Sequence, residues 1–310
     1  MKNVIVTGGC GFIGSHVVDE LIDENYSVTV IDNLSAEQNE EFHFNDEASY
    51  SHTDIKDYEA IAPLFEDVDY VFHLAAESRI QPTLEKPQEA CLTNFVGTCN
   101  VLEASRQHSV KRVMYSGTSS AYGRANRSLF SALMGSSSAP LSENMQRDCL
   151  NPYSVSKTAA EDLCKMYYTL WNLETVMFRY FNVYGERQPT KGQYAPVVGL
   201  FLRQKKAKEP LTLVGDGLQR RDFTHVKDVV KANTLAMESE NYGILGQIFN
   251  VGTGINHSVL EIAQLIGDDF TNLPPRPGES RETLADITKI SRELGYEPSV
   301  KLEDWIKENK

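Results

Sequence analysis

The sequence lacks long hydrophobic runs, an excess of positive charge and closely spaced cysteines. No segment approaches the length of a membrane span, so we expect no transmembrane helix. The chain has 30 lysines and arginines against 43 aspartates and glutamates, a net charge of −13. This balance disfavours general binding to nucleic acid or to anionic membranes. If the protein binds phosphate groups, it must do so with local groups that act against this overall charge.

The cysteines are few and far apart. An odd number of them, with no pair at the two-to-four-residue spacing of a zinc knuckle, predicts reduced thiols and no metal site. The N-terminal residues contain no basic segment followed by a long apolar stretch, so we expect no signal peptide and a cytoplasmic protein. The cysteines are Cys10, Cys91, Cys99, Cys149 and Cys164.

Short apolar segments alternate with amphipathic segments through the first half of the chain. This alternation predicts an α/β fold, in which helices cover both faces of a parallel sheet. We expect helices over residues 15–25 and 98–108, and strands over residues 3–7, 27–32, 69–74, 112–116, 175–179 and 247–251.

The second half is richer in proline and glycine, which predicts a smaller, loop-rich α/β lobe. We expect residues 1–180, with a returning segment near 224–251, to form the first domain. Residues 181–310 are expected to form most of the second lobe. The serine-rich segment 124–139 is expected to be a long surface loop.

A glycine-rich loop, T-G-G-C-G-F-I-G, follows the first predicted strand and contains Gly8, Gly11 and Gly14. Glycine suits a sharp turn with positive φ and allows the backbone to approach a pyrophosphate closely. The helix after the loop directs its free N–H groups and positive dipole end toward the phosphates. Strand, loop and helix together predict a dinucleotide site on a doubly wound parallel sheet of the Rossmann type.

The second predicted strand ends at Asp32. A carboxylate at that place accepts hydrogen bonds from the adenosine ribose and repels a ribose 2′-phosphate, so the sequence favours NAD over NADP. Asp54 and Ile55, after an expected third strand, are predicted to hold the adenine. The candidate cofactor residues of this region are Gly8, Gly11, Phe12, Ile13, Gly14, Asp32, Asn33, Asp54 and Ile55.

Tyr153 and Lys157 are four residues apart in a predicted helix that runs to about Trp171, so their side chains share one face. Free tyrosine has a pKa of about 10, too high for a base at neutral pH. A nearby ammonium and a positive nicotinamide ring favour the phenolate and lower that pKa. Residues 116–123, S-G-T-S-S-A-Y-G, place hydroxyls at the carboxyl edge of the sheet, where one of them can relay a hydrogen bond to the tyrosine.

In this order, the glycine loop, the hydroxyl-rich strand end and the Y-x-x-x-K spacing resemble the extended short-chain dehydrogenase/reductase family. The resemblance is to its nucleotide-sugar epimerase/dehydratase branch and covers nearly the whole chain. Further matching segments are H-L-A-A at 73–76, N-F-V-G-T at 94–98, R-Y-F-N at 179–182, G-D-G-L-Q-R-R-D-F at 215–223 and R-P-G-E at 276–279.

The resemblance implies a role for each matching residue. Tyr153 is expected to be the acid/base, Lys157 to bind the cofactor and tune the tyrosine, and either Thr118 or Ser119 to assist. The further residues implied to contact the cofactor are Leu74, Ala75, Ala76, Asn94 and Phe181.

The sugar nucleotide is expected to lie across the second lobe. Asn182, Arg221 and Arg276 are implied to hold its diphosphate, and a guanidinium suits this because it is permanently charged and binds phosphate oxygens as a fork. The implied substrate residues are Thr118, Ser119, Tyr153, Asn182, Pro196, Val197, Leu200, Thr212, Arg221, Arg276, Glu279 and Thr283.

The resemblance also narrows the reaction. Dehydratases of this branch carry an acidic pair after the assisting threonine, whereas this chain has Ser119 and Ser120, so no carboxyl group is there to protonate a leaving hydroxyl. The pattern resembles the 4-epimerases of UDP-hexoses, which form a transient 4-keto sugar on bound NAD. Thr283 stands where a small residue admits N-acetylhexosamines, so we expect UDP-GlcNAc and UDP-GalNAc as substrates besides UDP-Glc and UDP-Gal.

Two other functions stay open at this point. One is another nucleotide-sugar epimerase, reductase or decarboxylase on the same scaffold, and the other is a non-catalytic NAD-binding regulator. The helices near 94–108 and 153–171 are implied to form a homodimer interface, although packing of both against the sheet explains their apolar residues equally well.

Overall fold

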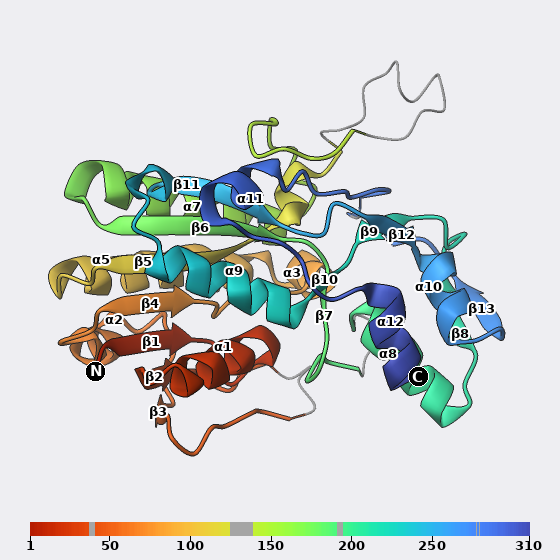
Figure 1. The fold of residues 1–310 in the computed structure, drawn as a ribbon, viewed down its shortest axis with the longest axis horizontal. Coiled ribbons are helices and arrows are strands. Elements are labelled where there is room, and N and C mark those ends of the chain that lie inside the picture. Colours follow the sequence, from red (N-terminus) through yellow and green to blue (C-terminus); the bar gives the residue numbers. More distant parts are fainter. Residues whose placement is uncertain (37–40, 125–138, 191–194, 277, 279) are drawn as a thin grey trace.

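The computed structural model describes residues 1–36, 41–124, 139–190, 195–276, 278 and 280–310. A seven-stranded sheet, in the order β11-β6-β5-β4-β1-β2-β3, forms the centre of the fold (Figure 1). Every neighbouring pair is parallel, which confirms the predicted α/β class. The strands are β1 (Asn3–Thr7), β2 (Ser27–Ile31), β3 (Ser49–Ser51), β4 (Tyr70–His73), β5 (Arg112–Thr118), β6 (Glu174–Tyr180) and β11 (Gln247–Val251).

The bounds of the predicted strands agree with the structure to within two residues. β1 and β11 have the predicted bounds, and β5 continues two residues beyond the prediction to Thr118, which pairs with Tyr180 of β6. Gly117 permits this extension, because a Cβ there would collide with the carbonyl oxygen of Phe178. The longer strand carries Thr118 to the carboxyl edge of the sheet.

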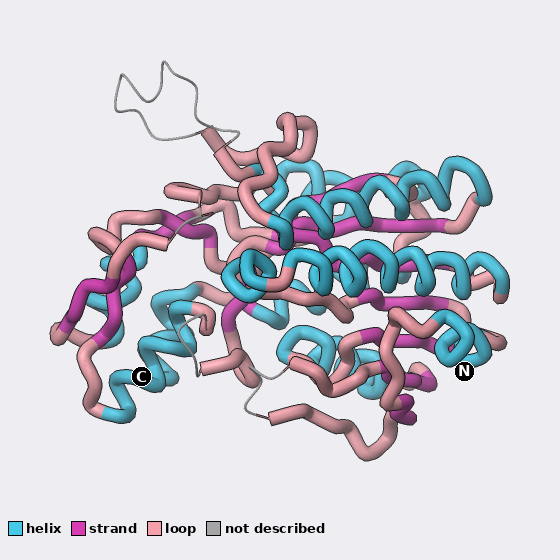
Figure 2. The backbone as a smooth tube through the Cα atoms, turned by 180° about the vertical axis from the view of Figure 1, so that it is seen from behind, coloured by secondary structure: helices cyan, strands magenta, loops and turns pink. Residues whose placement is uncertain are grey.

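Helices cover both faces of the sheet, as predicted. The first face carries α1 (Phe12–Asp23), α9 (Val226–Glu238) and α11 (Thr288–Leu294), which lie in front of the strands in Figure 1 and share one hydrophobic core. The opposite face carries α2 (Tyr58–Ile61), α5 (Thr98–Gln107) and α7 (Pro152–Trp171), which contribute to a second core. Figure 2 shows the molecule from this side, with the long helices in front of the sheet.

The start of α7 is fixed by its own sequence. Asn151 accepts a 2.8 Å hydrogen bond from the N–H of Ser154, and the Ser154 hydroxyl accepts one from the N–H of Asn151, a reciprocal pair that satisfies two free N–H groups. Pro152 follows at the first helical position, where its missing N–H has no consequence. This start places Tyr153 and Lys157 in the first two turns of α7.

The second lobe has its own hydrophobic core and lies to the right of the sheet in Figure 1. β7 (Val183–Tyr184) and β10 (Thr224–His225) pair with each other between the central sheet and this lobe. The lobe contains helices α8 (Val197–Ala207), α10 (Val259–Ile266) and α12 (Leu302–Asn309), the parallel pair β8 (Leu211–Val214) and β13 (Phe270–Leu273), and the antiparallel pair β9 (Arg220–Asp222) and β12 (Asn256–Ser258).

After the first pass through this lobe, the chain returns to the sheet. α9 packs against α1, and β11 pairs with β6. On this basis we propose the division into a cofactor domain, residues 1–180 with the returning segment 224–251, and a second lobe within 181–310. Of the predicted loop 124–139, residues 125–138 lie outside the described part of the chain.

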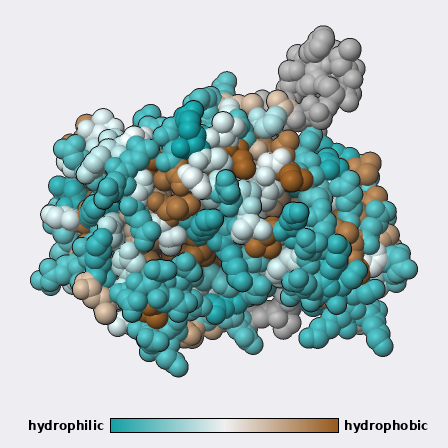
Figure 3. Space-filling model, viewed as in Figure 1, coloured by the Kyte–Doolittle hydropathy of each residue, from teal (hydrophilic) through white to brown (hydrophobic). Residues whose placement is uncertain are grey.

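No helix among the described residues is long and apolar enough to cross a membrane. The face of the molecule in Figure 3 is mostly hydrophilic, and its hydrophobic residues gather in separate patches rather than in one continuous surface.

Candidate active site

The glycine loop forms a cradle that side chains would fill. Gly8 has φ +72°, and a Cβ there would lie 2.7 Å from the backbone nitrogen of Ala75, which follows β4. A Cβ on Gly14 would collide with the carbonyl oxygen of Gly8. Gly11 has φ −83° and directly precedes α1, so it needs no left-handed backbone. The loop lies beside the β1–β4 contact, where the strand order reverses, and the open backbone fits a pyrophosphate.

Asp32 lies directly after β2 and is tied to this loop. Its carboxylate accepts hydrogen bonds from the N–H of Cys10 at 3.0 Å and from the N–H of Leu34 at 2.9 Å. These bonds hold the carboxylate beside the glycine loop, which keeps Asp32 a candidate to bind the ribose hydroxyls of a dinucleotide.

The adenine candidates divide into two groups. Asn33 donates a 3.0 Å hydrogen bond to Asp54, so these two polar side chains lie together after β2 and β3. The side chain of Ile55 is instead buried, and a Cβ added to Gly97 would lie 2.6 Å from it. If Ile55 holds the adenine, as predicted, it must therefore do so with its backbone groups.

Asn94 lies inside the protein, behind the segment that follows β4, and its contact with the cofactor stays a prediction. Its side chain is fully buried, accepts a 2.8 Å hydrogen bond from the N–H of Glu77, and donates to the Glu77 carbonyl and to Ser156, both at 3.0 Å. These bonds fix the segment that follows β4. Within that segment, Leu74 and Ala75 are half-buried and donate to Thr7 of β1.

Phe181 is also turned toward the core. Its side chain is fully buried in a cluster with Tyr122, Leu141 and Ala285, and the Tyr122 and Phe181 ring centres are 6.2 Å apart. The contact of Phe181 with the nicotinamide side of the cofactor therefore stays a prediction. The R-Y-F-N motif by itself does not show which side chain of the segment faces the core.

The structure distinguishes between the two candidate assisting hydroxyls. Burial raises the pKa of Tyr153, and the hydrogen bond with the Thr118 side chain opposes this shift and lowers the pKa. This contact favours Thr118 over Ser119 as the assisting hydroxyl, which stays a prediction. Burial disfavours the charged form of tyrosine, which is the phenolate. A positive charge nearby is therefore needed to stabilise it.

Lys157 is almost fully buried behind Tyr153, and its ammonium lies 4.5 Å from the centre of the Tyr115 ring. Burial lowers the pKa of Lys157 to about 8, and the nearby Glu161 carboxylate favours the charged form. Glu161 itself forms a buried ion pair with Arg179 at 2.7 Å. Lys157 is thus held inside the protein on the same helix as Tyr153, and its contact with the cofactor stays a prediction.

A further cation acts on Tyr153 that the sequence analysis did not single out. The guanidinium of Arg79 lowers the pKa of Tyr153, and burial lowers the pKa of Arg79 in turn. Arg79 follows the H-L-A-A segment closely and directly precedes α3 (Ile80–Glu85). A signal for Arg79 is present in the sequence, because it follows the predicted strand β4 and so lies toward the carboxyl edge of the sheet, where such sheets bind ligands.

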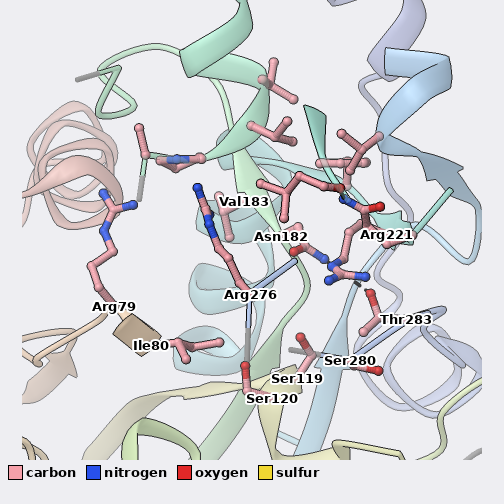
Figure 4. A pocket seen from close by; sticks show the side chains of 18 of the residues that line it. Arg79, Ile80, Ser119, Ser120, Asn182, Val183, Arg221, Arg276, Ser280 and Thr283 are labelled. Atoms are coloured by element: carbon pink, nitrogen blue, oxygen red, sulfur yellow. Dashed lines mark hydrogen bonds between the residues drawn. The ribbon is translucent and has the colours of Figure 1, made fainter. Parts of the chain in front are cut away.

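A cavity of about 330 Å³ opens between the carboxyl edge of the sheet and the second lobe (Figure 4). Its volume is within the range of small-molecule sites. Thr118 and Tyr153 are not among the residues that line it, and Glu279 lies outside the described residues. The predicted substrate residues that line it are Ser119, Asn182, Pro196, Val197, Leu200, Thr212, Arg221, Arg276 and Thr283.

Several of these side chains are already oriented by hydrogen bonds. Asn182 donates to the carbonyl of Asp222 at 2.9 Å and to the Thr283 hydroxyl at 3.4 Å, and Arg221 donates to the carbonyl of Arg220 at 2.9 Å. Figure 4 shows Asn182, Arg221 and Thr283 close together on one side of the cavity. Thr283 is small and nearly buried, so it leaves room where a larger side chain would project.

The charges around the cavity are of one sign. Among its described lining residues are three arginines, Arg79, Arg221 and Arg276, and no aspartate or glutamate. This arrangement favours an anionic ligand at the cavity, although the net charge of the whole chain is −13.

The sheet order, the glycine cradle and the Tyr153–Lys157 pair define a dinucleotide-dependent enzyme of the short-chain dehydrogenase/reductase type. The chain belongs to the NAD dependent epimerase/dehydratase family, which matches residues 4–252. The predicted enzyme class, an isomerase of the epimerase type with NAD as its cofactor, is thereby confirmed.

Known relatives cover almost the whole chain. A putative UDP-glucose 4-epimerase of Methanocaldococcus jannaschii is 35% identical over 98% of this chain and 96% of its own length. A UDP-N-acetyl-alpha-D-glucosaminuronate decarboxylase of Bacillus cytotoxicus is 32% identical over 99% and 96%. The crystal structure of UDP-glucose 4-epimerase with UDP-glucose from Thermotoga maritima superposes with a TM-score of 0.90 and 34% identity, covering 99% of this chain and 97% of that one.

Proposed function

We propose that this protein is a 4-epimerase of UDP-hexoses that oxidises the sugar transiently at C4 and returns the hydride to the opposite face. The observation that carries the proposal is the placement of Tyr153, with Thr118 as its hydrogen-bond partner and Lys157 behind it, next to a cavity that contains three arginines. In relatives, the same scaffold is named for epimerisation and for decarboxylation of UDP-sugars.

The chain's own residues divide the work. Tyr153 takes the proton of the 4-hydroxyl and later returns it to the same oxygen, and Thr118 stabilises the phenolate by hydrogen bonding. Lys157 supplies positive charge close to the phenolate, in a site where burial strengthens electrostatic interactions. Asn182, Arg221 and Arg276 hold the diphosphate while the keto sugar turns over between the two half-reactions.

Bound NAD would supply a reversible hydride acceptor for C4, so the reaction would need no external oxidant. The open backbone of the glycine loop, with no Cβ at Gly8 or Gly14, fits its pyrophosphate, and Asp32 fits its adenosine ribose. The side chains of Asn33 and Asp54 are the candidates for the adenine.

The substrate range follows from the sugar end of the cavity. Thr283 contributes little volume there, and its hydroxyl is occupied by Asn182. The proposed range therefore includes UDP-GlcNAc and UDP-GalNAc besides UDP-Glc and UDP-Gal. Replacement of Thr283 by tyrosine is expected to abolish turnover of the N-acetyl pair and to spare the plain pair.

The proposed active form is a homodimer. Exposed apolar side chains gather on α7 and on the turns before α5, a face that is separate from the cavity, and a second copy of the chain would cover them. Size-exclusion chromatography with light scattering measures the mass in solution and tests this. A Phe95→Glu variant should have the mass of a monomer. The residues are Leu92, Phe95, Val96, Val155, Leu170 and Trp171.

The decisive test of the reaction uses purified protein without added cofactor. Acid extraction should release NAD, and UDP-glucose should be converted to UDP-galactose, with the two separated by chromatography. The Tyr153→Phe variant should retain NAD and lose about 10²- to 10⁴-fold in kcat, as expected for loss of a general acid/base. Bound NAD without any turnover would instead identify a binding protein, and a decarboxylated product would identify the other chemistry of this family.

A further inference from the structure

The side chain of Asn151 makes two separate contacts where the two lobes meet. Its oxygen accepts a 2.8 Å hydrogen bond from the N–H of Ser154 at the start of α7, and its nitrogen donates a 3.0 Å hydrogen bond to the carbonyl of Gly278. Gly278 is 127 residues further along the chain, in the second lobe. Asn151 is only 6% exposed, so water competes little for either bond. One buried amide therefore joins the start of α7 to a segment of the other lobe.

That segment carries candidate substrate residues. Arg276 and Ser280 stand two residues before and two residues after Gly278, and all three line the cavity, as does Asn151 itself. Figure 4 shows the Arg276 and Ser280 side chains at the cavity. Arg276 is a proposed ligand of the diphosphate. Because the Gly278 carbonyl is fixed so close to it in sequence, the hydrogen bond from Asn151 restricts where the guanidinium can lie.

The backbone of Gly278 is suited to this contact. It has φ +77°, a conformation that residues with a side chain rarely adopt. Space is not the reason for glycine here, because an added Cβ would meet the Cβ of Asn151 and the carbonyl oxygen of Leu150 at 3.7 Å and Ile80 at 3.9 Å, all ordinary contacts. The conformation that brings the Gly278 carbonyl to Asn151 is therefore one that favours glycine.

Tyr153 follows Asn151 by two residues and lies in the first turn of α7. Because Asn151 holds both this turn and Gly278, the relative position of the Tyr153 hydroxyl and the diphosphate candidate Arg276 is fixed near one point. A small displacement of a substrate from its acid/base lowers the rate of reaction, so a contact at this point affects how the sugar meets Tyr153.

We propose that Asn151 is a positioning residue that couples the segment of Arg276 to the start of α7, so that a sugar nucleotide bound by the second lobe lies in register with Tyr153. The inference rests on the proposed function, because it takes Arg276 as a ligand of the diphosphate. Asn151 contacts the backbone of Gly278 and acts on the substrate through Arg276. The two contacts differ in what they need, since the helix cap needs only a side-chain acceptor and the link to Gly278 needs a donor.

Two variants of Asn151 separate these contacts. Serine is as good a helix cap as asparagine, but its hydroxyl ends one bond closer to the backbone than the amide nitrogen, so Asn151→Ser keeps the cap and loses the link. We expect its KM for UDP-glucose to rise about 2- to 10-fold, the effect of one neutral hydrogen bond, with little change in kcat. Asn151→Ala loses both contacts, so kcat and the midpoint of urea unfolding should fall as well.

The chain offers a matched control for this substitution. Asn241 also begins a helix, η4 (Tyr242–Ile244), by accepting a 2.9 Å hydrogen bond from the N–H of Gly243. Its side-chain nitrogen also donates to another segment, to Glu293 at 3.1 Å, and none of these residues lines the cavity. Asn241→Ser should therefore leave KM unchanged.

Gly278 tests the other end of the link. Gly278→Ala disturbs the carbonyl without changing α7, and its KM should rise at least as much as that of Asn151→Ser. If both changes break the same hydrogen bond, adding Asn151→Ser to Gly278→Ala should raise KM no further, whereas independent effects multiply. Gly295→Ala is the control for backbone strain, since Gly295 has φ +64° with nothing within 4 Å of an added Cβ and follows α11. It should leave KM unchanged.

Calorimetric titration with UDP gives a readout that does not depend on turnover. Asn151→Ser should weaken UDP binding by about the same 2- to 10-fold and retain its NAD, because the affected contact is to the diphosphate. Unchanged KM and unchanged UDP affinity in Asn151→Ser overturn the inference. A lower kcat with unchanged KM also overturns it, since Asn151 would then act on α7 alone.

The same experiments separate this inference from the proposed function. Epimerisation of UDP-glucose with the same KM in Asn151→Ser and the wild type overturns the coupling and leaves the 4-epimerase. UDP binding that Asn151→Ser weakens, without epimerisation of UDP-glucose by the wild type, supports the coupling and overturns the 4-epimerase. Absence of UDP binding by the wild type overturns both.

Discussion

The Lys157 ammonium lies 4.5 Å from the centre of the Tyr115 ring, and the Tyr115 hydroxyl donates a 3.1 Å hydrogen bond to the Lys157 carbonyl oxygen. Tyr115 thus contacts both the side-chain ammonium and the backbone carbonyl of Lys157. The ring face attracts the ammonium, and the hydrogen bond fixes the second turn of α7 against β5. Burial lowers the pKa of Lys157 to about 8, and the attraction of the ring face for the ammonium opposes that shift.

Two variants of Tyr115 separate these contacts. Tyr115→Phe keeps the ring and loses one hydrogen bond, so the free energy of unfolding should fall by about 1 kcal/mol with little change in activity. Tyr115→Leu removes the ring, so the pKa of Lys157 should fall below about 8, and both NAD retention and kcat should decline at pH 8. Urea unfolding and kcat measured from pH 6 to 9 check both. Equal activity in the two variants would show that the ring does not support the charge.

Thr118 should set the lower pH limit of the reaction. Its hydrogen bond lowers the pKa of Tyr153, so Thr118→Val should raise that pKa. The base form is the phenolate, so activity rises with pH through this pKa, and the rising limb of the kcat/KM profile should move to higher pH in the variant. Thr118→Ser retains a hydroxyl and should leave the limb in place, as should Ser119→Ala. A shift in Ser119→Ala and none in Thr118→Val would exchange the two roles.

The sequence predicted the fold well because the fold depends on local patterns. Buried parallel strands are continuous apolar runs, and the strand–glycine loop–helix unit needs only neighbours in sequence. The site is different, because it depends on which side of a segment faces the core. The side chains of Asn94 and Phe181 point into the protein, which their motifs do not show, and Arg79 lines the cavity although it belongs to no recognised motif. The burial that raises the pKa of Tyr153 likewise comes from packing and not from the Y-x-x-x-K spacing.

Gly8 should be essential for NAD retention. It has φ +72°, and an added Cβ would lie 2.7 Å from the backbone of Ala75, so Gly8→Ala must displace either the loop or the end of β4. The protein should then purify without NAD and be inactive. Gly267→Ala is the control, since its backbone is extended and the nearest atom to a Cβ is the flexible end of Lys205 at 3.4 Å. Absorbance of the acid extract and circular dichroism distinguish lost NAD from lost folding.

The buried ion pair of Glu161 and Arg179 should be a major determinant of stability. Both side chains are almost fully buried, with N···O 2.7 Å, so Glu161→Gln leaves the Arg179 charge without its carboxylate. Loss of one partner of such a pair costs about 3–5 kcal/mol. Arg106 and Glu103 form a matched pair at the surface, and Glu103→Gln should cost about 0–1 kcal/mol. Urea unfolding of both variants measures the difference, and equal losses would contradict it.

His73 should make the protein sensitive to acid. The ring is buried between Thr7 at 2.7 Å and Thr98 at 2.9 Å, and burial lowers its pKa to about 3. In the unfolded chain the pKa is about 6.5, so the unfolded state binds the proton first as the pH falls. The stability contributed by neutral His73 is therefore present above about pH 6.5 and decreases below it, by about 2 kcal/mol at pH 5. His73→Gln cannot titrate, so its free energy of unfolding should fall less steeply than that of the wild type between pH 7 and 5. Parallel curves for the two proteins would mean that other groups carry the acid sensitivity.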